Sequence, residues 1–191
     1  NVELIIGANT HKDILFFTTY GKVYRLRGYQ IPEFSRTSKG IPVVNLISAE
    51  KQEKVKVIIS IDSYDEEHQL TFITKQGIVK RVSLDQFESV RQNGKIAIEL
   101  RENDELIDVK LTDGNAEILI AANNGKLARF NETDVRSMGR TATGVKGIEM
   151  DEGVYVVGAA TNQEGEYVLT ISEHGDGKMT PIPEYRSTQR G

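Results

Sequence analysis

One short phrase recurs along this chain and constrains its fold more than any other feature. A glycine stands at positions 21, 77, 125 and 177, and each is followed by a run that mixes cationic and apolar residues, as in Gly21-Lys22-Val23-Tyr24-Arg25-Leu26. The steps between these glycines are 56, 48 and 52 residues. Self-similarity at a period of about 50 residues is typical of repeat proteins, whose units bury their apolar faces against one another. The 191 residues are therefore predicted to form one continuous array, with copies at approximately 10–61, 68–112, 115–160 and 165–191.

Each copy is predicted to contain four short strands. β-Branched and aromatic residues flank each recurring glycine, and an apolar period of 3.6 residues never persists for more than two turns. The glycine suits a hairpin turn, because it adopts positive φ without a Cβ clash. Four-stranded units at this spacing predict an all-β, propeller-like array of blades, here as an incomplete disc. The expected strands are 2–6, 14–19, 22–27, 41–47, 55–61, 70–74, 78–82, 96–100, 106–111, 117–121, 126–130, 145–150, 154–160, 167–171 and 178–182.

Charge is distributed unevenly along the repeat. The formal net charge is −4, but the windows 20–40, 75–95, 125–147 and 177–191 hold 18 of the 24 lysines and arginines and only 6 of the 28 acids. Their net charge is +12, against −16 for the remainder. Local clustering, rather than the total, sets the field that a polyanion meets. Equivalent loops repeated around a disc would then form a basic rim.

An arginine column runs through the strand after each glycine. Arg25, Arg81 and Arg129 stand four residues after their glycines, whereas Pro181 takes that place in the fourth copy. One interpretation is contact with phosphate groups. The other is protection of a strand edge against pairing with foreign chains, and the two can coexist.

Longer phrases resemble one known family, the C-terminal domain of the A subunit of bacterial DNA gyrase. They are residues 8–17 (ANTHKDILFF), 40–46 (GIPVVNL), 93–98 (NGKIAI), 104–107 (DELI) and 139–148 (GRTATGVKGI). The resemblance covers essentially the whole chain and implies a β-pinwheel, a propeller relative in which neighbouring repeats exchange strands. It implies that the chain is an internal fragment: the end of one blade, three full copies and part of a fourth. The Gln-Arg-Arg-Gly-Gly-Lys-Gly box of the family's first repeat is absent from these residues.

The resemblance implies a function in wrapping duplex DNA without sequence specificity, in support of ATP-dependent negative supercoiling by the complete enzyme. The expected partners are duplex DNA, the remainder of the gyrase A protein, and the gyrase B protein. Two alternatives stay open: the related domain of the topoisomerase IV A protein, and a propeller scaffold for protein partners. The DNA-binding candidates are Lys22, Arg25, Arg36, Lys39, Lys80, Arg81, Arg91, Lys95, Lys126, Arg129, Arg136, Arg140, Lys146, Arg186 and Arg190.

No catalytic or metal-binding constellation is expected in these residues. His11, His68 and His174 are far apart and lack metal-ligand spacing, and no phosphate-binding Gly-Lys-Ser/Thr loop occurs. Cysteine is absent, which excludes disulfides and thiolate metal sites. No cofactor is expected in this domain. No apolar run approaches the roughly 18 residues of a membrane span, so we expect no membrane partner. We expect a cytoplasmic location, which the absence of cysteine fits.

Overall fold

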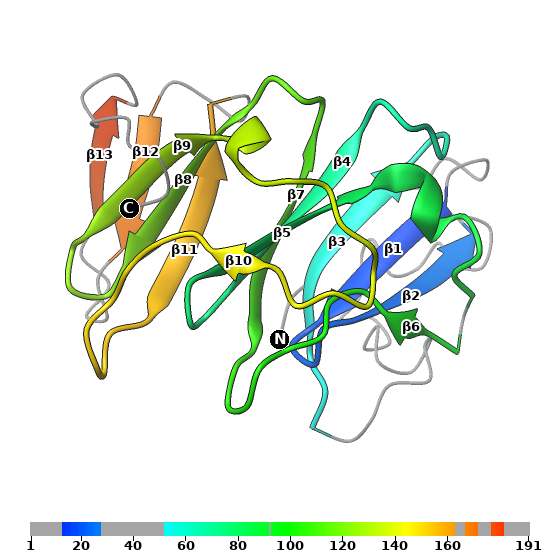
Figure 1. Ribbon diagram of the computed structural model, residues 1–191, viewed down its shortest axis with the longest axis horizontal. Helices are drawn as coiled ribbons and strands as arrows, with labels where there is room; N and C mark the ends of the chain where they lie inside the picture. The colour runs from blue at the N-terminus through cyan, green and yellow to red at the C-terminus, as the bar shows by residue number, and fades with distance from the viewer. Residues whose placement is uncertain (1–12, 28–51, 92, 163–166, 172–176, 182–191) are drawn as a thin grey trace, which may run out of the picture.

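The computed structural model describes residues 13–27, 52–91, 93–162, 167–171 and 177–181. Their regular structure consists of β-strands and two short 3-10 helices, arranged as antiparallel sheets that stand side by side along the long axis of the molecule (Figure 1). This is the predicted all-β, propeller-like array. Within the described residues, no helix is long and apolar enough to cross a membrane.

Four sheets follow one another along the chain. The first has the order β3 (Val55–Ile61), β1 (Asp13–Thr18), β2 (Lys22–Arg27) and β6 (Lys95–Ile96). The second has the order β7 (Leu106–Thr112), β4 (Gln69–Thr74), β5 (Ile78–Ser83) and β10 (Val145–Lys146). The third contains β11 (Val156–Thr161), β8 (Glu117–Ala122) and β9 (Leu127–Asn131). The fourth contains β12 (Tyr167–Ile171) and β13 (Gly177–Pro181).

Neighbouring copies exchange a strand. β6 comes from the second copy but pairs with β2 of the first, and β10 comes from the third copy but pairs with β5 of the second. The carbonyl oxygen of Gly21 accepts hydrogen bonds from the amides of Ala97 (2.8 Å) and Ile98 (3.1 Å), and that of Gly77 accepts one from Gly147 (2.8 Å). The exchange that the family resemblance implied is therefore present twice in the part of the chain that the structure describes.

The exchanged strands are shorter than predicted. Two residues pair in each, where the sequence predicted strands over 96–100 and 145–150. In the first case the reason is visible: two successive amides turn to the single carbonyl of Gly21, which ends the regular ladder. The other described strands lie within one or two residues of their expected bounds, and the expected strands 2–6 and 41–47 lie outside the described residues.

Apolar cores fill the spaces between sheets. Every residue of β1 is buried, with Leu15 and Phe17 packing toward the second sheet and Ile14 and Phe16 packing on the opposite face. The Phe17 and Phe72 rings meet edge to face, with centroids 5.5 Å apart. A second core joins β5 and β8 through residues such as Val79 and Ile120. Burial on both faces explains why these strands lack a simple alternation of apolar and polar residues.

The sequence did not predict the two 3-10 helices, η4 (Leu84–Phe87) and η5 (Glu132–Asp134). Each follows the second strand of its hairpin and lies between that strand and the exchanged segment. The Asn131 side chain accepts a hydrogen bond from the amide of Thr133 (3.0 Å), which caps η5. These helices bring acidic and carbonyl groups toward the preceding copy, and this placement decides which cations remain available at the surface.

Candidate nucleic-acid interface

Exposed cations of the predicted set lie at the hairpin turn of the third copy, on the segments that lead into the exchanged strands, and in those strands. The exposed members of the predicted set are Arg91, Lys95, Lys126, Arg136 and Lys146, while Lys22 and Arg140 are partly buried. Among the described residues, no carboxylate lies within ion-pair distance of the five exposed cations. Lys95 donates to the Ser89 hydroxyl (3.2 Å) and Lys126 to the Glu149 carbonyl (2.6 Å). Both bonds leave the positive charge uncompensated.

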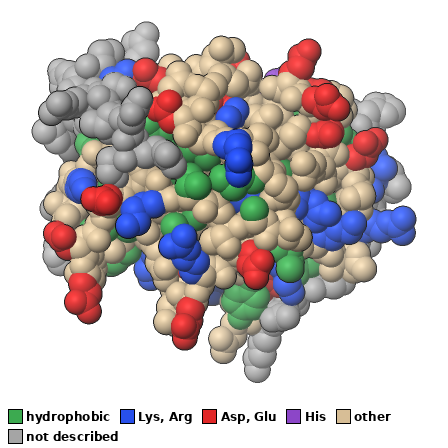
Figure 2. Space-filling model, in the orientation of Figure 1, with side chains coloured by type: hydrophobic (Ala, Val, Ile, Leu, Met, Phe, Trp, Pro, Cys, Tyr) green, Lys and Arg blue, Asp and Glu red, His purple; other side chains and the backbone are tan. Residues whose placement is uncertain are grey.

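One face of the molecule shows how these charges are distributed. Lysine and arginine side chains are spread across the middle of this face, and most aspartates and glutamates stand nearer its outline (Figure 2). β5 and β10 cross the middle of the same view (Figure 1). A field of this kind attracts a polyanion even though the net charge of the chain is −4.

The cations of the two exchanged strands are one residue out of register. Lys95 pairs with Val23, two residues after Gly21, whereas Lys146 pairs with Ile78, one residue after Gly77. Successive residues of a strand point to opposite faces, so the two lysines are not equivalent in the repeat. The position equivalent to Lys146 in the first exchanged strand is occupied by Ile96, which is 46% exposed. The expectation of equivalent cations at equivalent places therefore does not hold for the two exchanged strands.

The strand arginines are paired with carboxylates. Arg25 Nη1 lies 3.6 Å from Asp13 and donates to the Glu88 carbonyl (2.9 Å). Arg129 Nε donates to the Glu117 carboxylate (2.7 Å), and both side chains are partly exposed. Neither arginine presents a bare charge, so each is a weaker candidate for phosphate contact than the loop cations.

Arg81 is enclosed between the second and third copies. It is 8% exposed, and it donates to Glu132 (3.0 Å) and to the Val135 carbonyl (2.7 Å). Glu132 is fully buried and also accepts hydrogen bonds from the Thr112 hydroxyl (2.9 Å) and the Ala116 amide (2.8 Å). The expectation that Arg81 supports a DNA surface is therefore not met, because its charge is compensated inside the protein.

Lys80 is also not at the surface. Its side chain is fully buried, and its ammonium donates to backbone carbonyls of residues 97, 140 and 142. Burial lowers the pKa of Lys80 to about 7; the charge of Arg140 acts in the same direction and that of Glu99 opposes it. Contact of Lys80 with phosphate would require this site to open, so the structure removes it from the predicted set. The predicted residues Arg36, Lys39, Arg186 and Arg190 lie outside the described residues.

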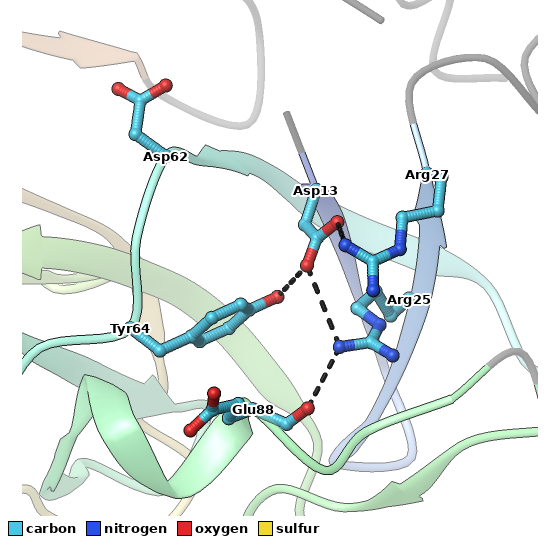
Figure 3. A pocket seen from close by; sticks show the side chains of 6 residues that line it. All are labelled: Asp13, Arg25, Arg27, Asp62, Tyr64 and Glu88. Atoms are coloured by element: carbon cyan, nitrogen blue, oxygen red, sulfur yellow. Dashed lines mark hydrogen bonds and ion pairs between the residues drawn. The ribbon is translucent and has the colours of Figure 1, made fainter. Parts of the chain in front are cut away.

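A polar hollow of about 400 Å³ lies between the first and second copies. Tyr64 donates to the Asp13 carboxylate (2.6 Å), which also receives Arg27 at 2.6 Å, and these side chains point toward one another (Figure 3). Burial, followed by the bond to Asp13, raises the pKa of Tyr64. The lining residues are Asp13, Arg25, Arg27, Asp62, Tyr64 and Glu88. Arg25 and Arg27 are already paired with Asp13 within the first copy, and Arg25 also donates to the Glu88 carbonyl of the second copy, so the hollow offers no bare cation to an anion.

The sequence offered no signal for this network, because its residues come from four separate segments. His68, predicted to be a loop residue, lies in the loop before β4 with its Nδ1 atom 2.9 Å from Asp65. Among the described residues, no three His, Asp or Glu side chains gather as a metal site would require.

Comparison with known proteins gives consistent matches. A family model described as the DNA gyrase C-terminal domain, beta-propeller, matches residues 12–55, 68–113, 116–162 and 166–191. The DNA gyrase A protein of Ureaplasma parvum serovar 3 is 52% identical over 191 residues, which cover 100% of this chain and 23% of the relative. The DNA gyrase A protein of Staphylococcus epidermidis is 49% identical over 193 residues, which cover 100% of this chain and 22% of the relative. The chain thus spans less than a quarter of the length of these curated relatives.

Two solved structures share the fold. The C-terminal domain of DNA topoisomerase IV superimposes with a TM-score of 0.86 at 27% identity, covering 95% of this chain and 57% of that one. The DNA gyrase A C-terminal domain superimposes with a TM-score of 0.79 at 25% identity, covering 100% of this chain and 64% of that one.

Proposed function

Because this chain belongs to the family of DNA gyrase C-terminal domains, we propose that it binds duplex DNA without sequence preference and bends the duplex along its basic loops. The observation that carries the proposal is the set of exposed cations on the hairpin turns and exchanged segments, for which no described carboxylate compensates. Backbone phosphates are the matching ligand, because lysine and arginine on loops of varied sequence read charge rather than base edges.

The number of exposed cations sets the expected strength of binding. Each lysine or arginine that neutralises a phosphate contributes about −0.9 to the slope of log K against log salt concentration. The five exposed cations therefore predict a slope of about −4.5. Bending a site of 20–30 base pairs costs about 1–6 kcal/mol, so several weak contacts must act together.

Within a complete gyrase, the chain would serve as the DNA-wrapping part of an ATP-hydrolysing type IIA topoisomerase. Its partners there are the remainder of the gyrase A protein and the gyrase B protein, and its location is the cytoplasm. The chemistry of strand breakage belongs to the rest of the enzyme, and this chain contributes the path of the DNA. The matches to DNA gyrase A proteins over the whole chain support this proposal.

A second candidate is the equivalent domain of topoisomerase IV, favoured by the TM-score of 0.86. The two candidates share duplex binding and differ in its consequence. The complete enzyme that carries this chain should introduce negative supercoils into a relaxed plasmid if it is a gyrase, and should only relax or decatenate DNA if it is a topoisomerase IV.

The direct test is binding to fluorescently labelled duplexes of about 40 base pairs at salt concentrations from about 50 to 200 mM. We expect affinity that falls steeply with salt and is the same for unrelated sequences. The charge-reversed variant R140E/K146E should bind more weakly to every duplex. No binding at about 50 mM salt would refute the proposal and leave the protein-scaffold alternative.

A further inference from the structure

The buried ammonium of Lys80 joins two loops that belong to different copies. It donates to the carbonyls of Ala97 (2.8 Å) and Ala142 (2.8 Å), and to that of Arg140. Ala97 directly follows the exchanged strand β6, whereas residues 140 and 142 lie in the loop that leads into β10. The Nζ atom also lies 5.9 Å from the centroid of the Phe72 ring. One side chain on β5 therefore holds two of the segments that carry surface cations.

The residue three positions after the recurring glycine faces the next copy in each of the first two copies. Tyr24, the equivalent of Lys80 three residues after its glycine, packs against Gly94, where a Cβ atom would lie 2.5 Å from the tyrosine ring. A Cβ atom at Gly144, the counterpart of Gly94, would lie 3.0 Å from Lys80. The third copy has Ala128 at this place. Of the three residues at this position, only Lys80 therefore binds the next copy's loop through charge-assisted hydrogen bonds.

Two further bonds reinforce the same connection. The Arg140 guanidinium donates to the Ile96 carbonyl (3.1 Å), and the Glu99 amide donates to the Ala142 carbonyl (3.3 Å). The loop from 139 to 144 is thereby laid across residues 96–99 of the second copy. Its position determines where Arg140 and Lys146 stand relative to Lys95.

We propose that Lys80 is a positioning residue for DNA contact: it fastens the loop that carries Arg140 and Lys146 to the neighbouring copy, and so fixes the spacing of the basic groups that meet successive phosphates. The inference rests on the proposed DNA-binding function. Lys80 itself touches no DNA, because its side chain is fully buried. It acts by keeping the loop ordered before the duplex arrives, which removes an ordering cost from binding.

The first test compares Lys80→Met with Lys54→Met in the full chain. Lys54 is exposed and lies outside the loop, and at about pH 6, where Lys80 is also protonated, its substitution matches the change in net charge. We expect Lys80→Met to increase amide hydrogen exchange in residues 139–147 without DNA and to weaken duplex binding about tenfold at about 0.1 M salt, because loop phosphate contacts are lost. Lys54→Met should change neither the exchange nor, by more than about twofold, the affinity.

A double-mutant cycle separates positioning from a general loss of structure. In a chain that already carries R140Q/K146Q, the Lys80→Met change should have little further effect on affinity, because the groups that it positions are gone. An equal loss of affinity in both backgrounds would overturn the proposal. So would a Lys80→Met chain that binds DNA and exchanges amides as the unsubstituted chain does.

Two measurements on the unsubstituted chain test the inference even if the Lys80→Met variant fails to fold. An amine-reactive reagent should leave Lys80 unmodified, whereas it should modify Lys54 readily. In a lysine-labelled NMR spectrum, one side chain should titrate near pH 7, in keeping with the lowered pKa of Lys80. Ready modification of Lys80 would overturn the inference. A chain with Lys80 protected and the loop ordered that binds no duplex would instead refute the proposed function.

Discussion

The buried Glu132 carboxylate offers the sharpest test of how the copies are joined. It accepts hydrogen bonds from Arg81 (3.0 Å), the Thr112 hydroxyl (2.9 Å) and the Ala116 amide (2.8 Å), and it is fully buried. Glu132→Leu preserves the approximate volume and removes all three acceptor contacts. The guanidinium of Arg81 is then left buried beside an apolar side chain.

The expected loss of stability follows from this geometry. Removing one partner of a buried ion pair costs about 3–5 kcal/mol, because the other charge remains uncompensated. Arg81 keeps its bond to the Val135 carbonyl, which offsets part of that cost. The Ala116 amide loses its acceptor, at a further cost of about 1–3 kcal/mol. We therefore expect Glu132→Leu to lower the free energy of unfolding by about 4 kcal/mol.

Urea denaturation followed by circular dichroism measures this loss. The matched control is Asp134→Leu, because Asp134 is exposed on the same 3-10 helix and should change stability by less than about 0.5 kcal/mol. Replacing both charges, as R81M/E132L, should recover about 2 kcal/mol relative to Glu132→Leu, since no unpaired charge remains. A Glu132→Leu chain within about 1 kcal/mol of the unsubstituted one would show that this ion pair does not hold the copies together.

Two further predictions concern the same junctions. Burial lowers the pKa of Lys80 from 10.5 to about 7; the charge of Arg140 adds to this shift and that of Glu99 opposes it. Above about pH 7, Lys80 therefore keeps its proton in the unfolded chain but loses it in the folded chain. The Lys80 contribution to stability should thus rise with pH from about 7 to 10 and stay constant below 7, and urea titrations should show this rise disappear in Lys80→Met. Gly94→Ala should cost about 1–3 kcal/mol more than Gly114→Ala in the same assay, because both glycines have positive φ but only the first would press a Cβ against Tyr24. Equal costs would contradict the packing described here.

The strands were predictable because local chemistry determines them. Each hairpin combines β-branched or aromatic residues with a glycine that the turn requires, and Gly21, Gly77 and Gly125 all have positive φ. These local signals do not depend on contacts with other copies. The observed bounds of the hairpin strands therefore differ from the expected ones by only one or two residues. The repeat period then indicated one array, and the sheets of Figure 1 follow it.

The exchanged strands were predicted at the wrong length because their pairing partners lie in another copy. Nothing in residues 96–100 reveals that Ala97 and Ile98 both donate to Gly21 of the preceding copy. The one-residue offset between Lys95 and Lys146 has the same origin, since register across a junction depends on packing rather than on local sequence.

The cations divide into groups that the sequence does not distinguish. Lys80 and Arg81 stand after a recurring glycine, as the exposed Lys126 does, and nothing local marks them as buried. Both are nevertheless enclosed by the next copy. Their partners are backbone carbonyls and Glu132, and carbonyls carry no signature in sequence. Arg136 was predicted with better reason, because it lies in a loop that no sheet covers, and Lys146 is exposed because β10 is the outer strand of its sheet.

The proposed DNA binding depends most directly on contacts between the exposed cations and phosphates, and the salt dependence of duplex binding measures these contacts. Binding of one duplex should be titrated with salt for the unsubstituted chain and for R136Q/K146Q. The account predicts that the slope of log K against log salt concentration becomes shallower by about 1.8 in the variant, equally for duplexes of unrelated sequence. An unchanged slope and affinity would contradict it, because these two cations would then contribute nothing to the DNA-binding surface.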